Sequence, residues 1–170
     1  MVTLPLDDLR ARAKRIRLVA TDVDGTLTDA TVFYSEKGEE LKRFSLRDGM
    51  GVQLLREAGI PTAIVTQEKS GFAEARAKKL GLEHCFLGVK HKADFLPDLC
   101  KRCGVEADAI AYIGDDVNDV GVMKLVALAG APGDALQAAR DAAHKITNAH
   151  GGRGAFREFS DWLLMLRGGT

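Results

Sequence analysis

Short runs of β-prone apolar residues alternate along the chain with longer segments of helical periodicity. Most of the short runs lack polar positions, as expected of strands that are covered on both faces of a parallel sheet. The strands that this pattern predicts are residues 17–22, 62–66, 84–87, 109–113, 126–129 and 145–146. The predicted helices are residues 49–57, 70–80, 92–103, 118–124, 135–144 and 155–166. The sequence therefore predicts an α/β fold in which a parallel sheet is flanked by helices.

One segment departs from this alternation. Residues 31–34 and 40–46 are both β-prone, and the turn-rich sequence Ser-Glu-Lys-Gly-Glu lies between them. This arrangement predicts a small β-hairpin insertion after the first strand, at about residues 29–47. Near the N-terminus, apolar residues alternate with charged ones as on a short amphipathic helix. No repeat or linker is visible, which predicts a single domain over residues 1–170 with a C-terminal tail at about residues 150–170.

The composition is that of an ordinary globular protein, with 46% apolar and 28% charged residues. Basic and acidic residues number 24 each, so no excess of positive charge points to nucleic acid or an anionic membrane surface. No apolar run is long enough to span a bilayer or to form the core of a signal peptide. We therefore expect a cytoplasmic protein with no nucleic-acid or membrane partner.

The three cysteines, Cys85, Cys100 and Cys103, are expected to be free thiols, because an odd number does not suit a disulfide framework. Cys100 and Cys103 form a C-x-x-C pair in a predicted helix. A structural zinc site needs four ligands, and the sequence offers no second pair. Packing is the simpler interpretation of this pair, and a redox or metal role is the alternative.

The first group of candidate chemical residues is Asp22-Val-Asp24-Gly25-Thr-Leu-Thr, which follows directly on the first apolar strand. Ligands bind beyond the carboxyl ends of parallel strands. Two carboxylates in such a place can divide the work, one attacking phosphorus and the other transferring protons. Gly25 allows the backbone to approach a phosphate closely. A calcium loop is excluded because Leu27 and Phe33 stand where it needs Gly and Glu.

A second acidic group, Gly-Asp115-Asp116-Val-Asn-Asp119, follows the strand predicted at residues 109–113. Carboxylates this close repel one another unless a cation lies between them, and Mg²⁺ prefers oxygen ligands of this kind. An acidic helix N-cap is the alternative interpretation for Asp116 and Asp119.

Thr66 and Lys92 add two weaker signals. Thr66 ends the second sheet strand, where its hydroxyl can bond a phosphate oxygen, although a helix cap is the simpler role. Lys92 opens a predicted helix, and an isolated lysine there is usually solvated. Their positions support a function, because four successive strands end in a nucleophile, a hydroxyl, a cation and metal-binding carboxylates.

These four elements in this order resemble the conserved motifs of the haloacid dehalogenase superfamily, whose fold is a Rossmann-like sheet. The resemblance implies a phosphatase in which Asp22 forms an aspartyl-phosphate. It implies that Asp24 protonates the leaving oxygen and then activates water. The resemblance also implies a Mg²⁺ ion held by the Asp22 carboxylate, the Asp24 backbone carbonyl and Asp115. The supporting and phosphate-binding residues that it implies are Asp116, Asp119, Thr66, Lys92 and Gly25.

The connections between the motifs are too short for a cap domain. The chain most resembles the capless subgroup that removes phosphate from 3-deoxy-2-ulosonic acids, either 3-deoxy-D-manno-octulosonate (KDO) 8-phosphate or the nine-carbon KDN and N-acylneuraminate 9-phosphates. This likeness includes the hairpin, residues 44–49 and the glycine-rich residues 151–158. It implies a homotetramer in which hairpins form a central barrel and neighbouring subunits help close each site around a small phosphorylated sugar acid.

The evidence from individual residues is divided between these substrates. Arg47 resembles the eight-carbon enzymes, whereas Glu68, Arg76 and Lys79 are closer to the nine-carbon enzymes. KDO 8-phosphate is slightly favoured, and Gln67 departs from both groups. The resemblance places Arg153 near a substrate or a neighbouring subunit, and a helix-capping role for its segment is the alternative.

Two other functions compete with this hypothesis. An uncapped monomer could act on a phosphoprotein or a nucleic-acid end, although the neutral charge disfavours nucleic acid. A catalytically inactive regulatory module is disfavoured because all four motif positions are intact.

Overall fold

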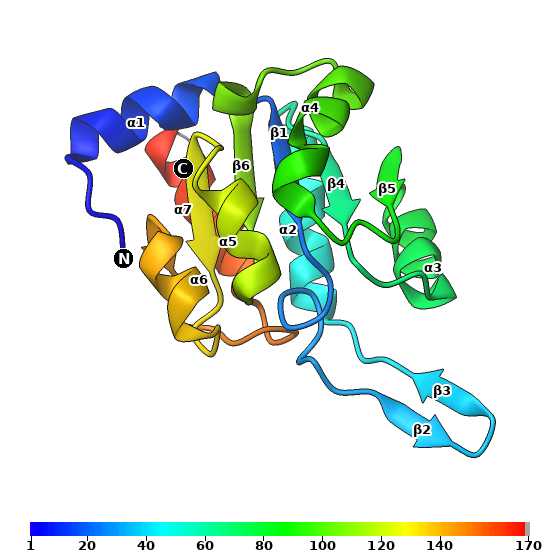
Figure 1. Cartoon of the computed structure of the whole chain (residues 1–170). Helices are drawn as coiled ribbons and strands as arrows, with labels where there is room; N and C mark the ends of the chain where they lie inside the picture. Colours follow the sequence, from blue (N-terminus) through cyan, green and yellow to red (C-terminus); the bar gives the residue numbers. More distant parts are fainter. Residues whose placement is uncertain (169–170) are drawn as a thin grey trace.

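A computed structural model of the chain describes residues 1–168 and contains a six-stranded parallel sheet (Figure 1). The strand order is β5-β4-β1-β6-β7-β8, with β1 near the centre between β4 and β6. The chain passes from β1 to β4 and β5 on one side and then crosses to β6 on the other side, which places a crevice beyond the carboxyl end of β1. The strands are β1 Leu18–Thr21, β4 Thr62–Val65, β5 His84–Phe86, β6 Ile110–Ile113, β7 Leu128–Ala131 and β8 Lys145–Ile146.

Helices cover both faces of the sheet, which confirms the α/β fold expected from the sequence. Buried side chains of α1, α2, α3 and α7 form one apolar cluster, and those of α4, α5 and α6 form another on the opposite face. The bounds are α1 Leu6–Arg15, α2 Leu46–Glu57, α3 Gly71–Leu80, α4 Lys92–Cys103, α5 Val117–Met123, α6 Gln137–Ala142 and α7 Ala155–Leu166, with a 3₁₀ turn at Ala107–Ala109.

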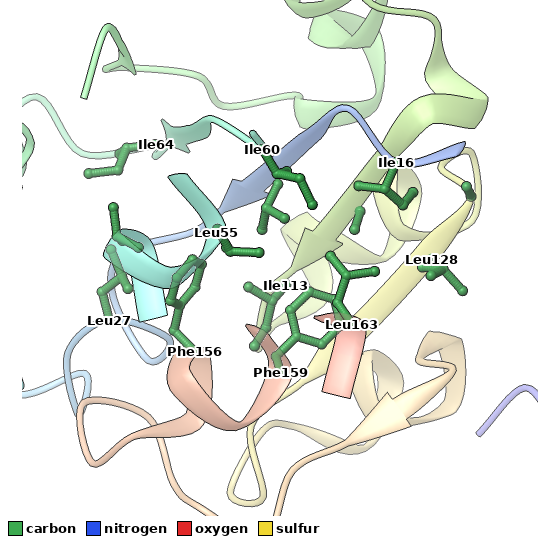
Figure 2. Close-up of a cluster of buried hydrophobic side chains, with 14 of the residues drawn as sticks. Ile16, Leu27, Leu55, Ile60, Ile64, Ile113, Leu128, Phe156, Phe159 and Leu163 are labelled. Carbon is green, nitrogen blue, oxygen red and sulfur yellow. The ribbon is translucent and has the colours of Figure 1, made fainter. Parts of the chain in front are cut away.

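In the central strands β1, β4 and β6, successive residues enter opposite clusters, as the two-residue period of a strand requires. In β1, Val19 joins the first cluster, whereas Leu18 and Ala20 join the second. Figure 2 shows Phe156 and Phe159 of α7 among the side chains of the first cluster. The sheet is therefore buried on both faces, and its strand ends are held in fixed positions.

The hairpin strands β2 Phe33–Ser35 and β3 Gly38–Leu41 pair antiparallel and project away from the sheet (Figure 1). The hairpin is confirmed, but the prediction that its second strand extends to residue 46 is wrong. Helix α2 already begins at Leu46, because the Ser45 side chain caps it by accepting a hydrogen bond from the Arg47 backbone N–H at 3.1 Å.

Two further boundaries differ from the prediction. Strand β7 begins two residues later than expected, because its pairing with β6 starts at Leu128. Helix α6 is shorter at both ends than the predicted helix at residues 135–144. It begins later because residues 132–136 form a turn, after which the Leu136 backbone N–H donates to the Asp115 carbonyl. The run from Val126 to Ala131 contains no polar side chain, so the start of the strand could not be located from the sequence alone.

The connections between the strands contain no cap domain within residues 1–168: the β1–α2 connection contains only the hairpin, and the β4–α4 connection contains α3 and β5. None of the described helices is both long enough and apolar enough to cross a lipid bilayer. The predicted C-terminal tail includes Gly169 and Thr170, which lie outside the described residues.

The N-terminus of α7 is capped by a residue from α2. Gly154 at the N-cap has no side chain, and the buried Asp48 carboxylate accepts hydrogen bonds from the backbone N–H groups of Gly154 at 3.3 Å and Arg157 at 3.0 Å. This contact satisfies two of the donors that a helix leaves free at its start.

We expect Asp48→Ala to lower the free energy of unfolding by about 1–3 kcal/mol, because it leaves two partly buried N–H groups without an acceptor. Urea denaturation of the metal-loaded protein measures the change. Asp141→Ala is a suitable control because Asp141 is exposed. Equal stability of the Asp48 variant and the wild type would show that water replaces the cap.

Candidate active site

Residues from three strand ends meet in an open pocket of about 390 Å³. Strands β1, β4 and β6 are adjacent in the sheet, so their carboxyl ends present side chains to the same crevice. The pocket contains six of the residues predicted for the site, namely Asp22, Asp24, Thr66, Glu68, Asp115 and Asp116. Its other lining residues are Ala30, Gln67, Val117 and Asn118.

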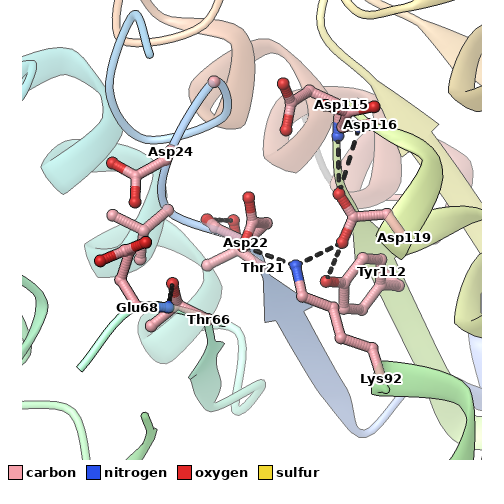
Figure 3. Close-up of polar contacts among 12 residues, drawn as sticks. Thr21, Asp22, Asp24, Thr66, Glu68, Lys92, Tyr112, Asp115, Asp116 and Asp119 are labelled. Carbon is pink, nitrogen blue, oxygen red and sulfur yellow. Dashed lines mark hydrogen bonds and ion pairs between the residues drawn. The ribbon is translucent and has the colours of Figure 1, made fainter. Parts of the chain in front are cut away.

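Lys92 lies beneath this pocket and is completely enclosed by the protein. Its ammonium nitrogen is 2.6 Å from Asp22 Oδ1 and 2.6 Å from Asp119 Oδ1 (Figure 3). Lysine is almost never buried in this way unless it is paired. The lysine therefore fixes the position of the predicted nucleophile and offsets part of the negative charge at the site.

Asp119 connects Lys92 to the loop after β6. Its Oδ1 accepts from Lys92 and from the Tyr112 hydroxyl at 2.6 Å, and its Oδ2 accepts from the backbone N–H groups of Asp115 at 3.0 Å and Asp116 at 3.3 Å. Asp116 in turn caps α5, and it forms a capping box with Asp119. Both acidic residues thus shape the loop that presents Asp115, as the N-cap interpretation expected, and their support of a bound metal stays a prediction.

Gly25 allows the loop after β1 to lie against Asp115. Its φ of 89° lies in the left-handed region, and a Cβ atom there would lie 2.0 Å from Asp115 Oδ2. Another residue would thus be strained and would collide with the carboxylate. The structure gives Gly25 this role in packing, and a contact between its backbone and phosphate stays a prediction.

The glycine-rich tail packs on the same loop. The Gly152 backbone N–H donates to the Thr26 carbonyl at 3.0 Å, and a Cβ at Gly151 would lie 2.0 Å from the Gly25 carbonyl oxygen. The tail therefore supports the loop of the predicted nucleophile, beyond leading into α7.

Thr66 is buried at the end of β4, and its hydroxyl oxygen accepts a hydrogen bond from the Glu68 backbone N–H at 3.2 Å. This bond shapes the turn into the pocket and leaves the hydroxyl hydrogen able to donate to a phosphate oxygen. Glu68 and Gln67 are exposed beside it. A contact between Thr66 and phosphate stays a prediction.

Asp22, Asp115 and Asp119 each place one carboxylate oxygen within 4.8 Å of the others, which forms a candidate metal centre. Asp115 Oδ1 is buried and has no hydrogen-bond partner among the described residues. A hard cation such as Mg²⁺ would supply that missing partner, and oxygen ligands are the ones that it prefers. Because the oxygens of Asp119 already accept four hydrogen bonds, Asp22 and Asp115 are the carboxylates best able to bind the ion directly.

The electrostatics of the metal-free site favour protons on two of these carboxyl groups. Burial raises the pKa of Asp22 to about 7, the lowering effect of Lys92 is smaller, and Asp119 adds to the rise. Burial also raises the pKa of Asp115 to about 8, with the charges of Asp22 and Asp119 contributing. Uncompensated negative charge is therefore costly at this site, and a cation would relieve that cost.

These shifts predict that Mg²⁺ binds more tightly as the pH rises. Between the ordinary carboxyl pKa near 3.8 and the raised values near 7 and 8, the folded protein holds protons that the unfolded chain has released. The metal-free protein should therefore lose stability as the pH rises through this range. Mg²⁺ must displace the same protons, so we expect its affinity to increase on the order of 100- to 1,000-fold between pH 6 and pH 8.

Isothermal titration calorimetry of Mg²⁺ binding at pH 6, 7 and 8 measures this dependence. Asp115→Asn is the matched variant, because it removes one of the two titrating groups and should flatten the profile as well as weaken binding. Affinity independent of pH in the wild type would contradict the electrostatic account.

Four basic residues predicted to contact substrate or a neighbouring subunit lie outside the pocket of this chain. Arg47 and Arg153 line a separate hollow of about 350 Å³. Arg76 donates to the Ser45 carbonyl at 2.7 Å and lies over the Phe44 ring, whereas Lys79 is exposed on α3. For all four residues, a contact with substrate stays a prediction.

Three polar residues around the site were not among the candidates predicted from the sequence. Lys42 pairs with Asp24 at 2.8 Å, Tyr112 bonds Asp119, and Asn118 lines the pocket with its Oδ1 buried and unpartnered among the described residues. Asn118 could have been found, since it lies within the second acidic motif. Lys42 and Tyr112 become neighbours of the site only through the fold.

The cysteine pair has no visible part in this chemistry. Cys100 and Cys103 are free, partly buried and packed against the second apolar cluster, and burial raises the pKa of Cys103 to about 11. A raised pKa keeps a thiol protonated and unreactive. These observations agree with the packing interpretation.

Comparisons with known proteins support the site described above. Residues 45–126 match the family model of haloacid dehalogenase-like hydrolases. The chain is 38% identical over 161 residues to the 3-deoxy-D-manno-octulosonate 8-phosphate phosphatase KdsC of Escherichia coli, an alignment that covers 95% of this chain and 86% of the relative.

Solved structures agree in fold and in family. The cobalt-bound Haemophilus influenzae deoxy-D-mannose-octulosonate 8-phosphate phosphatase superposes with a TM-score of 0.88 at 38% identity, covering 92% of each chain. The Moraxella catarrhalis KDO 8-phosphate phosphatase, in complex with magnesium, phosphate and KDO, has a TM-score of 0.90 at 35% identity, covering 96% of this chain and 94% of that one. This chain therefore belongs to the KdsC family of phosphatases within the haloacid dehalogenase-like hydrolases.

Proposed function

We propose that this protein is a Mg²⁺-dependent phosphatase that hydrolyses KDO 8-phosphate to KDO and inorganic phosphate. The observation that supports this proposal most strongly is Asp22, buried at the end of β1 with Lys92 at 2.6 Å and Asp115 nearby. Family membership supplies the substrate class, since the relatives are named for this ester and one of them binds KDO, phosphate and magnesium together.

Asp22 acts as the nucleophile in the first step. Its Oδ1 is held by Lys92, so its other oxygen is left to attack phosphorus. The new bond joins that oxygen to phosphorus while the bond from phosphorus to the sugar oxygen breaks. The Lys92 charge compensates the negative charge beneath the transferring group, which is the main contribution of proteins to phosphoryl transfer.

Asp24 transfers the protons in both steps. As an acid it protonates the departing sugar oxygen, and as a base it removes a proton from the water that attacks the aspartyl-phosphate. That attack breaks the bond to Asp22 and releases inorganic phosphate. Mg²⁺, when bound by Asp22 and Asp115, supplies further positive charge to the phosphoryl oxygens.

The proposed substrate needs a site more enclosed than the open pocket of one chain, and we propose that a homotetramer encloses it. The projecting hairpin exposes Phe33, Tyr34 and Leu41 at 64%, 68% and 63% of their surfaces, and Leu46 beyond it at 84%. Exposed apolar residues clustered in this way are typical of an interface. Light scattering measures the mass, and a monomer would favour a macromolecular substrate instead.

The substrate proposal is tested by phosphate release from KDO 8-phosphate and from KDN and N-acetylneuraminate 9-phosphates, compared at equal concentration with Mg²⁺. We expect the highest kcat/KM for KDO 8-phosphate. Preference for a nine-carbon ester would assign the other branch, toward which Glu68 pointed in the sequence. Turnover of an aryl phosphate alone would leave the phosphatase chemistry intact and remove the sugar-acid substrate.

A further inference from the structure

Lys42 has a buried side chain that makes an ion pair with the partly exposed Asp24, and the reaction described above does not use this pair. Its side chain is only 2% exposed, and its ammonium nitrogen lies 2.8 Å from Asp24 Oδ1. Ordering and burying a lysine costs free energy, which only a well-formed pair offsets. The pair joins the chain just beyond the hairpin to the loop after β1.

This contact distinguishes the two oxygens of Asp24. Oδ1 accepts from Lys42 and, at 3.4 Å, from the Thr28 hydroxyl. Oδ2 is buried and accepts no hydrogen bond from any residue between 1 and 168. A buried oxygen without a partner is costly, unless it holds a proton or meets a group of the substrate.

We propose that Lys42 is a positioning residue that, by fixing Oδ1, holds the Asp24 carboxyl group in the orientation in which it exchanges the catalytic proton. This proposal rests on the proposed phosphatase function. In the first step the proton leaves the Asp24 carboxyl group for the sugar oxygen, and the carboxylate that forms is stabilised by the ammonium. In the second step the same carboxylate accepts a proton from water.

The placement of Lys42 also links this proton transfer to the hairpin. Lys42 is the first residue after β3, and β3 ends at Leu41, whose side chain is exposed on the projecting hairpin. Lys42 does not line the pocket, so it acts on the substrate through Asp24. A direct contact with the substrate would instead appear as a change in KM.

The test compares Lys42→Met, which keeps the length without the charge, with Lys42→Arg and with Lys101→Met as a control. Lys101 is exposed on α4 and does not line the pocket. Rapid-quench kinetics measure the first chemical step for aryl phosphates with good leaving groups and for alkyl phosphates, including KDO 8-phosphate. Proton donation matters little for a good leaving group and greatly for an alkoxide.

We expect Lys42→Met to slow the first step about 10- to 100-fold for alkyl phosphates and less than about 3-fold for the best aryl phosphates, with KM within about 2-fold. Lys42→Arg should recover most of the rate, and Lys101→Met should match the wild type. An equal loss on all esters, an increase in KM alone, or no change would overturn the proposal.

Two control measurements show whether a rate loss comes from a misfolded variant and whether the substrate proposal itself is wrong. Thermal unfolding and Mg²⁺ binding of each variant show whether the fold and metal site persist, and Lys42→Gln replaces the methionine variant if that variant unfolds. If the wild type cleaves aryl and simple alkyl phosphates but not KDO 8-phosphate, the substrate proposal fails. The leaving-group comparison then still tests Lys42.

Discussion

Replacing Asp22 by asparagine is expected to lower kcat by a factor on the order of 10,000 or more, because it removes the oxygen that attacks phosphorus. The amide is nearly the same size as the carboxyl group, and its oxygen can still accept from Lys92. The loss should therefore come from chemistry and not from a disturbed fold. Steady-state phosphate release with saturating Mg²⁺ measures it.

For the same variant we expect no loss of stability, in contrast to its loss of activity. Burial raises the pKa of Asp22, so its charge is costly in the metal-free fold at pH 8. Asp22→Asn should thus unfold without metal at a temperature equal to or above that of the wild type. Turnover near the wild-type rate would remove Asp22 as the nucleophile, and a lower unfolding temperature would mean that its charge stabilises the fold.

Asp24→Asn is expected to slow the reaction by about 100- to 10,000-fold, because an amide can neither donate the proton to the sugar oxygen nor accept one from water. Unlike Asp22, Asp24 is not one of the three residues whose carboxylate oxygens form the candidate metal centre. The variant should accordingly bind Mg²⁺ as the wild type does, as calorimetry can show.

The leaving group provides the discriminating measurement for Asp24. Relative to the wild type, Asp24→Asn should slow the first step much more with an alkyl phosphate than with an activated aryl phosphate. Asp22→Asn should be inactive with both esters. Rapid-quench kinetics on the two esters measure this difference. Equal rate losses for both esters would refute the role of Asp24 as the acid.

The sequence predicted the centre of the site because its chemistry follows the ends of parallel strands. Asp22 comes directly after β1, Thr66 directly after β4, and Asp115 shortly after β6. These three strands are neighbours in the sheet. The order of the apolar runs and the spacing of the motifs were enough to bring these side chains together. The hairpin and the lack of a cap were likewise visible from segment lengths.

What the sequence did not predict depends on tertiary contacts. The hairpin returns the chain so that Lys42 reaches Asp24, and no local pattern encodes that return. The burial of Lys92 between Asp22 and Asp119 also depends on the fold, because an isolated lysine at the start of a helix is usually solvated. Its contact with a phosphoryl oxygen stays a prediction. Helix α2 begins at Leu46 because Ser45 caps it, although the preceding residues favour a strand.

The measurement that tests the central claim most directly is the location of the phosphoryl group during turnover. The wild type with Mg²⁺ is mixed with KDO 8-phosphate, quenched in acid within one turnover and digested for mass spectrometry. We predict a phosphoryl group on Asp22, in a peptide that is unmodified in Asp22→Asn. Phosphate release without any phosphorylated Asp22 peptide, under conditions that preserve acyl phosphates, would contradict the account.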